Sequence, residues 1–142
     1  MREPVEVALG LVVRSGRILV QRREGDSGLG EVWEFPGGKI GPGEAREAAV
    51  AREVAEETGI EVRVGELLSA HCHAYPDRRV SLYAYLCAPL APGGASSAPG
   101  PTGWRWVTPE ECRRLDMPGA NRPILMALAG SVQWYGVEPR PV

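Results

Sequence analysis

Three glutamates near the middle of the chain restrict its structure and chemistry more than any other feature. Glu53, Glu56 and Glu57 stand at positions i, i+3 and i+4, so a helix places all three carboxylates on one face. Like charges at this spacing repel one another, at a cost of about 0.2–0.5 kcal/mol per pair. A divalent cation removes the repulsion, and Mg²⁺ binds a few carboxylates together with phosphate oxygens of a substrate. The pattern predicts a helix with a magnesium site; the alternative is a solvated acidic surface.

The flanking residues predict where this helix begins and ends. Residues 41–43 (Gly-Pro-Gly) interrupt regular structure before it, and Gly59 stands where a left-handed C-cap would fall. Residues 35–38 (Phe-Pro-Gly-Gly) lead into this segment, and glycines let a backbone approach a ligand or metal closely. We therefore expect a loop–helix–loop unit that carries the carboxylates.

The segment from Gly38 to Ile60 resembles the Nudix box, the signature of hydrolases that cleave nucleoside diphosphates linked to another group. Gly38 is followed by Glu44 and then by Arg-Glu-Val-Ala-Glu-Glu-Thr-Gly-Ile at residues 52–60. Every defining position of the box is filled. The resemblance implies a Nudix fold, which is an α/β fold: an α-β-α sandwich with a mixed sheet and a loop-helix-loop catalytic motif.

The resemblance also implies a role for each charged residue of the box. The backbone carbonyl of Gly38 would join Glu53, Glu56 and Glu57 in binding Mg²⁺, for which Mn²⁺ is a substitute. In this chain Glu53 is the best candidate for the general base, either directly or through the metal-bound water. The other two charged residues would act indirectly: Glu44 through a water or its charge alone, and Arg52 by orienting a glutamate. For Arg52 the alternative is an ordinary surface ion pair.

Segments outside the box resemble the MutT branch of the family, which hydrolyses oxidised purine nucleoside triphosphates such as 8-oxo-dGTP. The segments are residues 33–40 (Trp-Glu-Phe-Pro-Gly-Gly-Lys-Ile), 75–78 (Tyr-Pro-Asp-Arg) and 118–124 (Pro-Gly-Ala-Asn-Arg-Pro-Ile). The resemblance implies that Asn121 reads the base. Its amide offers a donor and an acceptor, which match the O6 acceptor and N7–H donor of an 8-oxopurine. The alternative is that Asn121 only caps the following helix.

Four further residues are candidates for substrate binding. Phe35 would lie against the base, with packing in the core as the alternative, and the turn at Arg78 would reach the purine. Arg23 and Lys39 are candidate phosphate contacts by charge and position, although Arg23 could equally end a solvated strand.

One position departs from the family pattern. The family supplies a further glutamate six residues before the tryptophan that matches Trp104, and this chain has Ala98 there. The surrounding residues 89–103 include four prolines and four glycines and no charged residue, a composition that predicts a mobile loop. Slow turnover or dependence on Glu53 would follow from the missing acid.

The remaining patterns predict strands and two further helices. Aliphatic runs predict strands at residues 5–13, 18–21, 62–75, 80–86 and 104–107, with turns at 14–17 and 76–79. Thr108 begins a capping box with a proline after it, and a last helix is predicted over residues 122–129. We expect one domain over residues 1–130 and a C-terminal tail over 131–142.

Composition limits the function classes. The chain has 142 residues and a net charge of −2, which argues against polynucleotide binding, and no apolar run long enough to span a membrane. Its cysteines, Cys72, Cys87 and Cys112, lack metal-ligand spacing, so we expect free thiols and a cytoplasmic protein. His71 and His73 share one strand face and are expected to be surface residues. A small-molecule nucleotide is the expected partner; the oligomeric state stays open.

These patterns favour a hydrolase that converts a nucleoside triphosphate to the monophosphate and pyrophosphate, most specifically an oxidised-purine sanitising enzyme. One alternative is a Nudix pyrophosphohydrolase that prefers CTP, a modified pyrimidine triphosphate or another nucleoside diphosphate derivative. The other is a nucleotide-binding module with weak catalysis, for which Ala98 is the reason.

Overall fold

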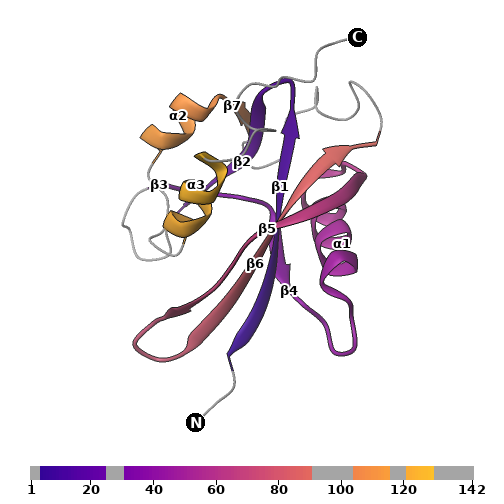
Figure 1. Cartoon of the computed structure of the whole chain (residues 1–142), viewed down its shortest axis with the longest axis vertical. Coiled ribbons are helices and arrows are strands. Elements are labelled where there is room, and N and C mark those ends of the chain that lie inside the picture. The colour runs from indigo at the N-terminus through magenta and orange to yellow at the C-terminus, as the bar shows by residue number, and fades with distance from the viewer. Residues whose placement is uncertain (1–3, 25–30, 91–103, 116–120, 130–142) are drawn as a thin grey trace.

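The structure is a computed structural model, and it describes residues 4–24, 31–90, 104–115 and 121–129 (Figure 1). Strands precede and follow the first helix in the chain, and two short helices close it. The elements are β1 (Val5–Arg14), β2 (Arg17–Glu24), β3 (Glu31–Glu34), β4 (Gly37–Lys39), α1 (Arg46–Thr58), β5 (Val62–Ala74), β6 (Arg79–Pro89), β7 (Trp104–Val107), α2 (Pro109–Arg114) and α3 (Arg122–Ala129).

Strand β1 is the centre of a mixed sheet whose order is β3-β2-β1-β6-β5. Along one edge β1 pairs in parallel with β6, from Val5 opposite Val80 to Val12 opposite Cys87. Along the other edge β4 pairs with its first half and β2 with its end, both antiparallel. Strand β7 extends the sheet by pairing with β2. The predicted mixed sheet is confirmed.

The side chains of β1 alternate between two cores, one on each face of the sheet. Leu9 and Leu11 join a cluster that includes residues of α2 and α3, whereas Ala8 and Val12 join a cluster built with α1. Figure 1 shows α1 on one side of the strands and α2 and α3 on the other. The α-β-α sandwich predicted from the sequence is confirmed.

Most of the predicted elements are confirmed within a few residues. Strand β7 and helix α3 have the predicted bounds, and Thr108 forms a complete capping box with Glu111. Strand β6 spans Arg79–Pro89 and is longer than the predicted strand at 80–86. Pro89, predicted as the first residue of a loop, is the last residue of this strand. Residues 91–103, which include Ala98, and the predicted tail at 131–142 lie outside the described residues.

Strands β3 and β4 were missed by the sequence analysis. Residues 31–39 contain Pro36 and two adjacent glycines, which are typical of loops rather than strands. Strand β4 nevertheless pairs with β1, with Gly37 opposite Leu9 and Gly38 opposite Ala8. A Cβ atom at Gly37 would collide with the Ala8 carbonyl, so this close pairing needs a glycine.

The three cysteines are free thiols, as predicted, with Cys72 exposed and Cys87 and Cys112 buried. Burial raises the pKa of Cys87 to about 12 and that of Cys112 to about 11. Both buried cysteines therefore stay protonated at neutral pH and act as small apolar side chains. Within the described ranges, no helix has the length and apolar character needed to cross a membrane.

Gly10 sets how closely α1 packs on β1, and replacing it should destabilise the protein. A Cβ atom there would stand 2.6 Å from Cγ2 of Val54 and 3.4 Å from Cγ1 of Val50. We predict that Gly10→Ala lowers the free energy of unfolding by about 1–3 kcal/mol in urea denaturation, as overpacking of a core does. Adding Val54→Ala to Gly10→Ala should recover part of that loss. Equal stability of Gly10→Ala and the wild type would contradict this packing.

Candidate active site

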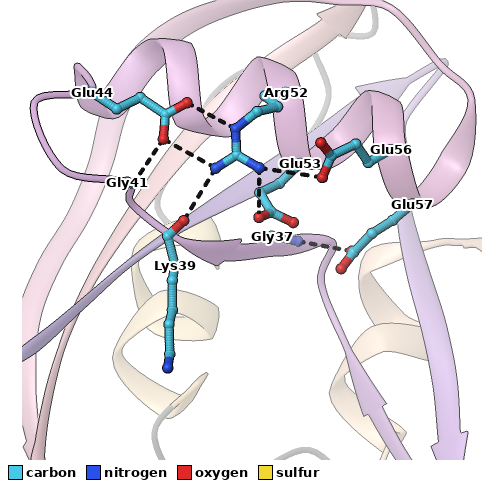
Figure 2. A network of polar contacts seen from close by, with 8 residues as sticks. All are labelled: Gly37, Lys39, Gly41, Glu44, Arg52, Glu53, Glu56 and Glu57. Atoms are coloured by element: carbon cyan, nitrogen blue, oxygen red, sulfur yellow. Dashed lines mark hydrogen bonds and ion pairs between the residues drawn. The ribbon is translucent and has the colours of Figure 1, made fainter.

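Helix α1 presents the glutamates because its opposite face is buried. Its buried residues are Ala49, Val50 and Val54. The helix ends at Thr58, and its C-cap Gly59 has the predicted left-handed conformation (φ 76°) and donates its N–H to the Ala55 carbonyl at 2.9 Å. The last two turns carry Glu53, Glu56 and Glu57 outside this buried face. Figure 2 shows these three side chains next to β4.

Arg52 lies at the centre of a network of polar contacts (Figure 2). Its Nε and Nη2 donate to the two carboxylate oxygens of Glu44, at 2.8 and 3.0 Å, as a two-bond fork. Its Nη1 donates to Glu53 at 3.0 Å and Glu56 at 3.2 Å, and Nη2 also reaches the Lys39 carbonyl at 3.2 Å. These contacts favour the first of the two alternatives that the sequence left open, in which Arg52 orients glutamates.

Glu44 is held by this network from two sides. Besides the Arg52 fork, its Oε1 accepts the N–H of Gly41 at 2.8 Å. The Arg52 hydrogen bonds, followed by the Gly41 N–H, lower the pKa of Glu44 to about 2. The contacts with Glu44 also raise the pKa of Arg52. Glu44 is therefore a fixed anion that anchors the loop between β4 and α1.

Glu53 and Glu57 lie against the two glycines of β4. A Cβ atom at Gly38 would stand 2.5 Å from the carboxyl carbon of Glu53, so any larger residue there would require that carboxylate to move. The Oε1 of Glu57 accepts the N–H of Gly37 at 3.1 Å, and its side chain points toward β4 and away from Arg52 (Figure 2). Backbone and carboxylates thus meet at β4.

Among the described residues, negatively charged side chains outnumber positively charged ones around Glu57. Partial burial raises the pKa of Glu57, and repulsion from Glu53, Glu34 and Glu56 raises it further, while the Gly37 N–H opposes the change. Arg52 is the one cation that contacts Glu44, Glu53 and Glu56 among the contacts of the described residues. The cluster keeps an excess of negative charge, which a divalent cation would neutralise.

The donor set fits a hard divalent cation, although the carboxylates would have to turn to bind it. In the described part of the chain, no three His, Cys, Asp or Glu side chains already converge as metal ligands. The reason is that Arg52 holds Glu53 and Glu56, and Gly37 holds Glu57. Carboxylate and carbonyl oxygens such as those of Glu53, Glu56, Glu57 and Gly38 are nevertheless the donors that Mg²⁺ prefers.

Two of the predicted substrate-binding residues, Phe35 and Asn121, lie away from the Arg52 network. Phe35 is only 3% exposed and belongs to the core cluster that α3 covers, so the core-packing alternative is the one observed. Asn121 comes directly before α3 and is 7% exposed, the one buried polar residue in the described ranges. Phe35 and α3 thus lie on the face of the sheet opposite α1.

The three cationic candidates are spread over the molecule. The side chain of Lys39 is exposed and points away from the carboxylates (Figure 2). Arg78 lies at the turn between β5 and β6, with its guanidinium 5.2 Å from the Tyr75 ring centroid and 3.7 Å from Asp77. The Arg23 backbone pairs with Val32, and its side chain lies outside the described part of the structure.

His71 and His73 share a strand face as predicted, but neither is a fully exposed surface residue. Both are partly buried, and they pair with Leu82 and Val80, which belong to the core cluster on the α3 side. The ring of His73 meets Tyr75 edge-on, with centroids 4.7 Å apart. Both side chains are therefore partly exposed and face the α3 side of the sheet.

The sequence analysis also missed two residues near the carboxylates. Glu34 is one source of the repulsion that raises the pKa of Glu57. The indole N–H of Trp104 donates to the Glu57 carbonyl at 3.2 Å. Alternation in β3 could have placed Glu34 opposite to Phe35, since neighbouring residues of a strand point to opposite faces. No local pattern reveals the Trp104 contact.

The chain is similar to known proteins along nearly all of its described length. A family model described as NUDIX domain matches residues 8–127. A CTP pyrophosphohydrolase of Escherichia coli is 33% identical over 123 residues, which cover 87% of this chain and 90% of the relative. An 8-oxo-dGTP diphosphatase of the same organism is 32% identical over 127 residues, with 87% and 95% covered.

Solved structures agree with this similarity. The solution structure of the E. coli ORF135 protein superposes with a TM-score of 0.75 at 28% sequence identity. It covers 99% of this chain, and this chain covers 95% of it. A crystal structure of a MutT protein from Methanosarcina mazei has a TM-score of 0.68 at 23% identity, covers 89% of this chain and supports the fold alone.

The lowered pKa of Glu44 predicts how stability depends on pH. The pKa of Glu44 in the folded state, about 2, lies below the ordinary 4.5, so its stabilising contribution is present above about pH 4.5 and is lost as the pH falls through 2. Arg52→Gln should raise this pKa toward the ordinary value, as measured by carboxyl NMR. The free energy of unfolding of this variant should then fall less between about pH 4.5 and pH 2 than that of the wild type. Arg46→Gln, a control on the same helix, should leave the Glu44 titration unchanged. An unshifted Glu44 pKa in Arg52→Gln would refute the assignment.

Proposed function

The chain belongs to the Nudix hydrolase family and is a pyrophosphohydrolase, and from this membership we propose its reaction. It hydrolyses a nucleoside triphosphate to the monophosphate and pyrophosphate, with Mg²⁺ bound at the carboxylates of α1. The observation that carries the proposal is the cluster of Glu53, Glu56 and Glu57 beside the backbone of Gly37 and Gly38.

The chain's own residues would divide the work as follows. The Gly38 carbonyl, Glu53, Glu56 and Glu57 hold the cation, and Mn²⁺ substitutes for Mg²⁺. When bound, the cation neutralises phosphate charge and makes a bound water more acidic. Glu53, oriented by Arg52 at 3.0 Å, accepts the proton of the attacking water. Arg52 and Glu44 are positioning residues, since their fork fixes the loop that precedes α1.

Glu57→Gln should abolish pyrophosphate release while the protein stays folded. The raised pKa of Glu57 means that its ionised form opposes folding at neutral pH, so the neutral glutamine should leave the melting temperature equal or higher. This gain should shrink as the pH falls and Glu57 becomes protonated. Glu47→Gln, which changes an exposed glutamate in the first turn of α1, is the matched control and should keep full activity. Wild-type turnover by folded Glu57→Gln would contradict the site.

The substrate we propose is an oxidised purine nucleoside triphosphate such as 8-oxo-dGTP. Supporting this choice, a relative that covers 87% of the chain is named 8-oxo-dGTP diphosphatase. A second support is the position of Asn121, which comes directly before α3 as in the resembling MutT segment. There it would make two hydrogen bonds to O6 and N7–H of an oxidised purine. Guanine has an acceptor at N7 and would leave one bond unmade.

A second candidate substrate is CTP or a modified pyrimidine triphosphate. The relative named CTP pyrophosphohydrolase is 33% identical and favours it. Burial of Phe35 in the core also removes one proposed contact to a purine ring. The choice between the two candidate substrates therefore depends on Asn121. It is the proposed base contact, and an oxidised purine and a pyrimidine would pair with it differently.

A nucleotide panel with Asn121→Ala tests the substrate directly. The wild-type protein should prefer 8-oxo-dGTP over dGTP by roughly ten- to two-hundred-fold in kcat/KM, from pyrophosphate release with Mg²⁺. Asn121→Ala should lower kcat/KM for 8-oxo-dGTP much more than for dGTP, whereas Arg122→Ala, at the exposed next position, should keep the ratio. Preference of the wild type for CTP or dCTP would support the second candidate. An equal loss on both purines would make Asn121 a helix cap only.

A further inference from the structure

The last turn of α1 is held by a residue from a distant strand. The carbonyl of Glu57 lies one residue before the helix ends at Thr58, where carbonyl groups lack an N–H partner within the helix. The indole N–H of Trp104, the first residue of β7, donates to this carbonyl at 3.2 Å. Because Trp104 is 47 residues away in the sequence, the contact is a tertiary tie between the catalytic helix and the sheet.

Strand register independently places Trp104 on the α1 side of the sheet. Gln21 of β2 pairs with Trp104 of β7 on one edge and with Glu34 of β3 on the other, and residues opposite one another share a face. The face is the α1 face, since Leu19, two residues before Gln21, packs in the α1 cluster together with Trp104. Gln21 also donates its amide to Glu34 at 3.3 Å. The three side chains form one row beside the end of α1.

Glu57 is thereby fixed at two points. Its carboxylate accepts the Gly37 N–H of β4 at 3.1 Å, and its carbonyl accepts the Trp104 indole N–H of β7 at 3.2 Å. Strand β4 is paired with β1, and β7 with β2, so the two contacts come from separate parts of the sheet. Helix ends fray most easily, and Glu57 stands at such an end while carrying uncompensated negative charge.

We infer that Trp104 is a positioning residue for the cation site. Its indole N–H holds the last turn of α1 so that the Glu57 carboxylate stays beside Gly37 and Gly38. This inference rests on the proposed role of Glu57 in binding the cation. It assigns Trp104 a task that ring packing alone would not perform, because the indole N–H donates to the Glu57 carbonyl at the helix end.

Trp104→Phe removes the N–H donor and keeps an aromatic ring. The readout is Mn²⁺ binding to the substrate-free protein, measured by electron paramagnetic resonance. We expect the Kd for Mn²⁺ to rise about three- to tenfold, which corresponds to about 0.7–1.4 kcal/mol. Amide hydrogen exchange of residues 57–60 should also become faster. Trp106→Phe is the matched control, since Trp106 packs on the same cluster from the same strand and its ring lies 4.6 Å from the Arg14 guanidinium. It should leave the Kd unchanged.

The outcomes separate this inference from the proposed function. If Glu57→Gln binds Mn²⁺ as tightly as the wild type, the cation site itself is wrong. If Glu57→Gln weakens Mn²⁺ binding but Trp104→Phe does not, only the role of Trp104 fails. Equal weakening by both tryptophan variants would assign the effect to ring packing and overturn the inference.

A measurement on the wild-type protein keeps the inference testable if Trp104→Phe does not fold. Coupling between two events is reciprocal, so a hydrogen bond that favours cation binding must itself be strengthened by the cation. Adding Mg²⁺ should therefore slow the exchange of the Trp104 indole N–H, followed by NMR, while the Trp106 indole N–H keeps its rate. An unchanged Trp104 rate at saturating Mg²⁺ would overturn the inference.

Discussion

The Arg52 guanidinium is the contact on which the geometry of the site depends. It joins three parts of the chain: the end of β4 through the Lys39 carbonyl, the following loop through Glu44, and its own helix through Glu53 and Glu56. Because β4 pairs with β1, the helix is tied through Arg52 to the centre of the sheet. A single cation cannot neutralise all the neighbouring carboxylates, and the pKa of Glu57 is raised by burial first and by repulsion from Glu53, Glu34 and Glu56 in addition. The same arrangement thus orders the glutamates and leaves negative charge that a divalent ion would neutralise.

The sheet separates the proposed phosphate chemistry from the proposed base recognition, and a short segment connects them. Gly37 and Gly38 contact the glutamates of α1, whereas Phe35, only two residues earlier, is buried in the cluster that α3 covers. Asn121 stands at the start of α3. Residues 35–38 therefore join the strand beside the carboxylates to the core beneath α3.

Local signals were sufficient to predict much of the fold and the carboxylate cluster. The spacing of Glu53, Glu56 and Glu57, the glycine after the helix and the capping box at Thr108 each depend on residues within one or two turns, and the structure contains the predicted elements. Non-local features were not predicted. Strand β4 exists only because β1 pairs with it, and the Trp104 contact joins residues 47 positions apart. The burial of Phe35 likewise depends on α3, which no pattern near Phe35 reveals.

Paramagnetic broadening by Mn²⁺ tests the central claim most directly, because it locates the cation without relying on turnover. In the ¹H–¹⁵N spectrum of the substrate-free protein, substoichiometric Mn²⁺ should first erase the amide signals of residues 37–38 and 53–57. Signals of the exposed Cys72 and its neighbours on β5 should persist. Glu57→Gln should require more Mn²⁺ for the same loss. Broadening centred elsewhere, or spread evenly over the chain, would contradict a cation site formed by the carboxylates of α1 and the glycines of β4.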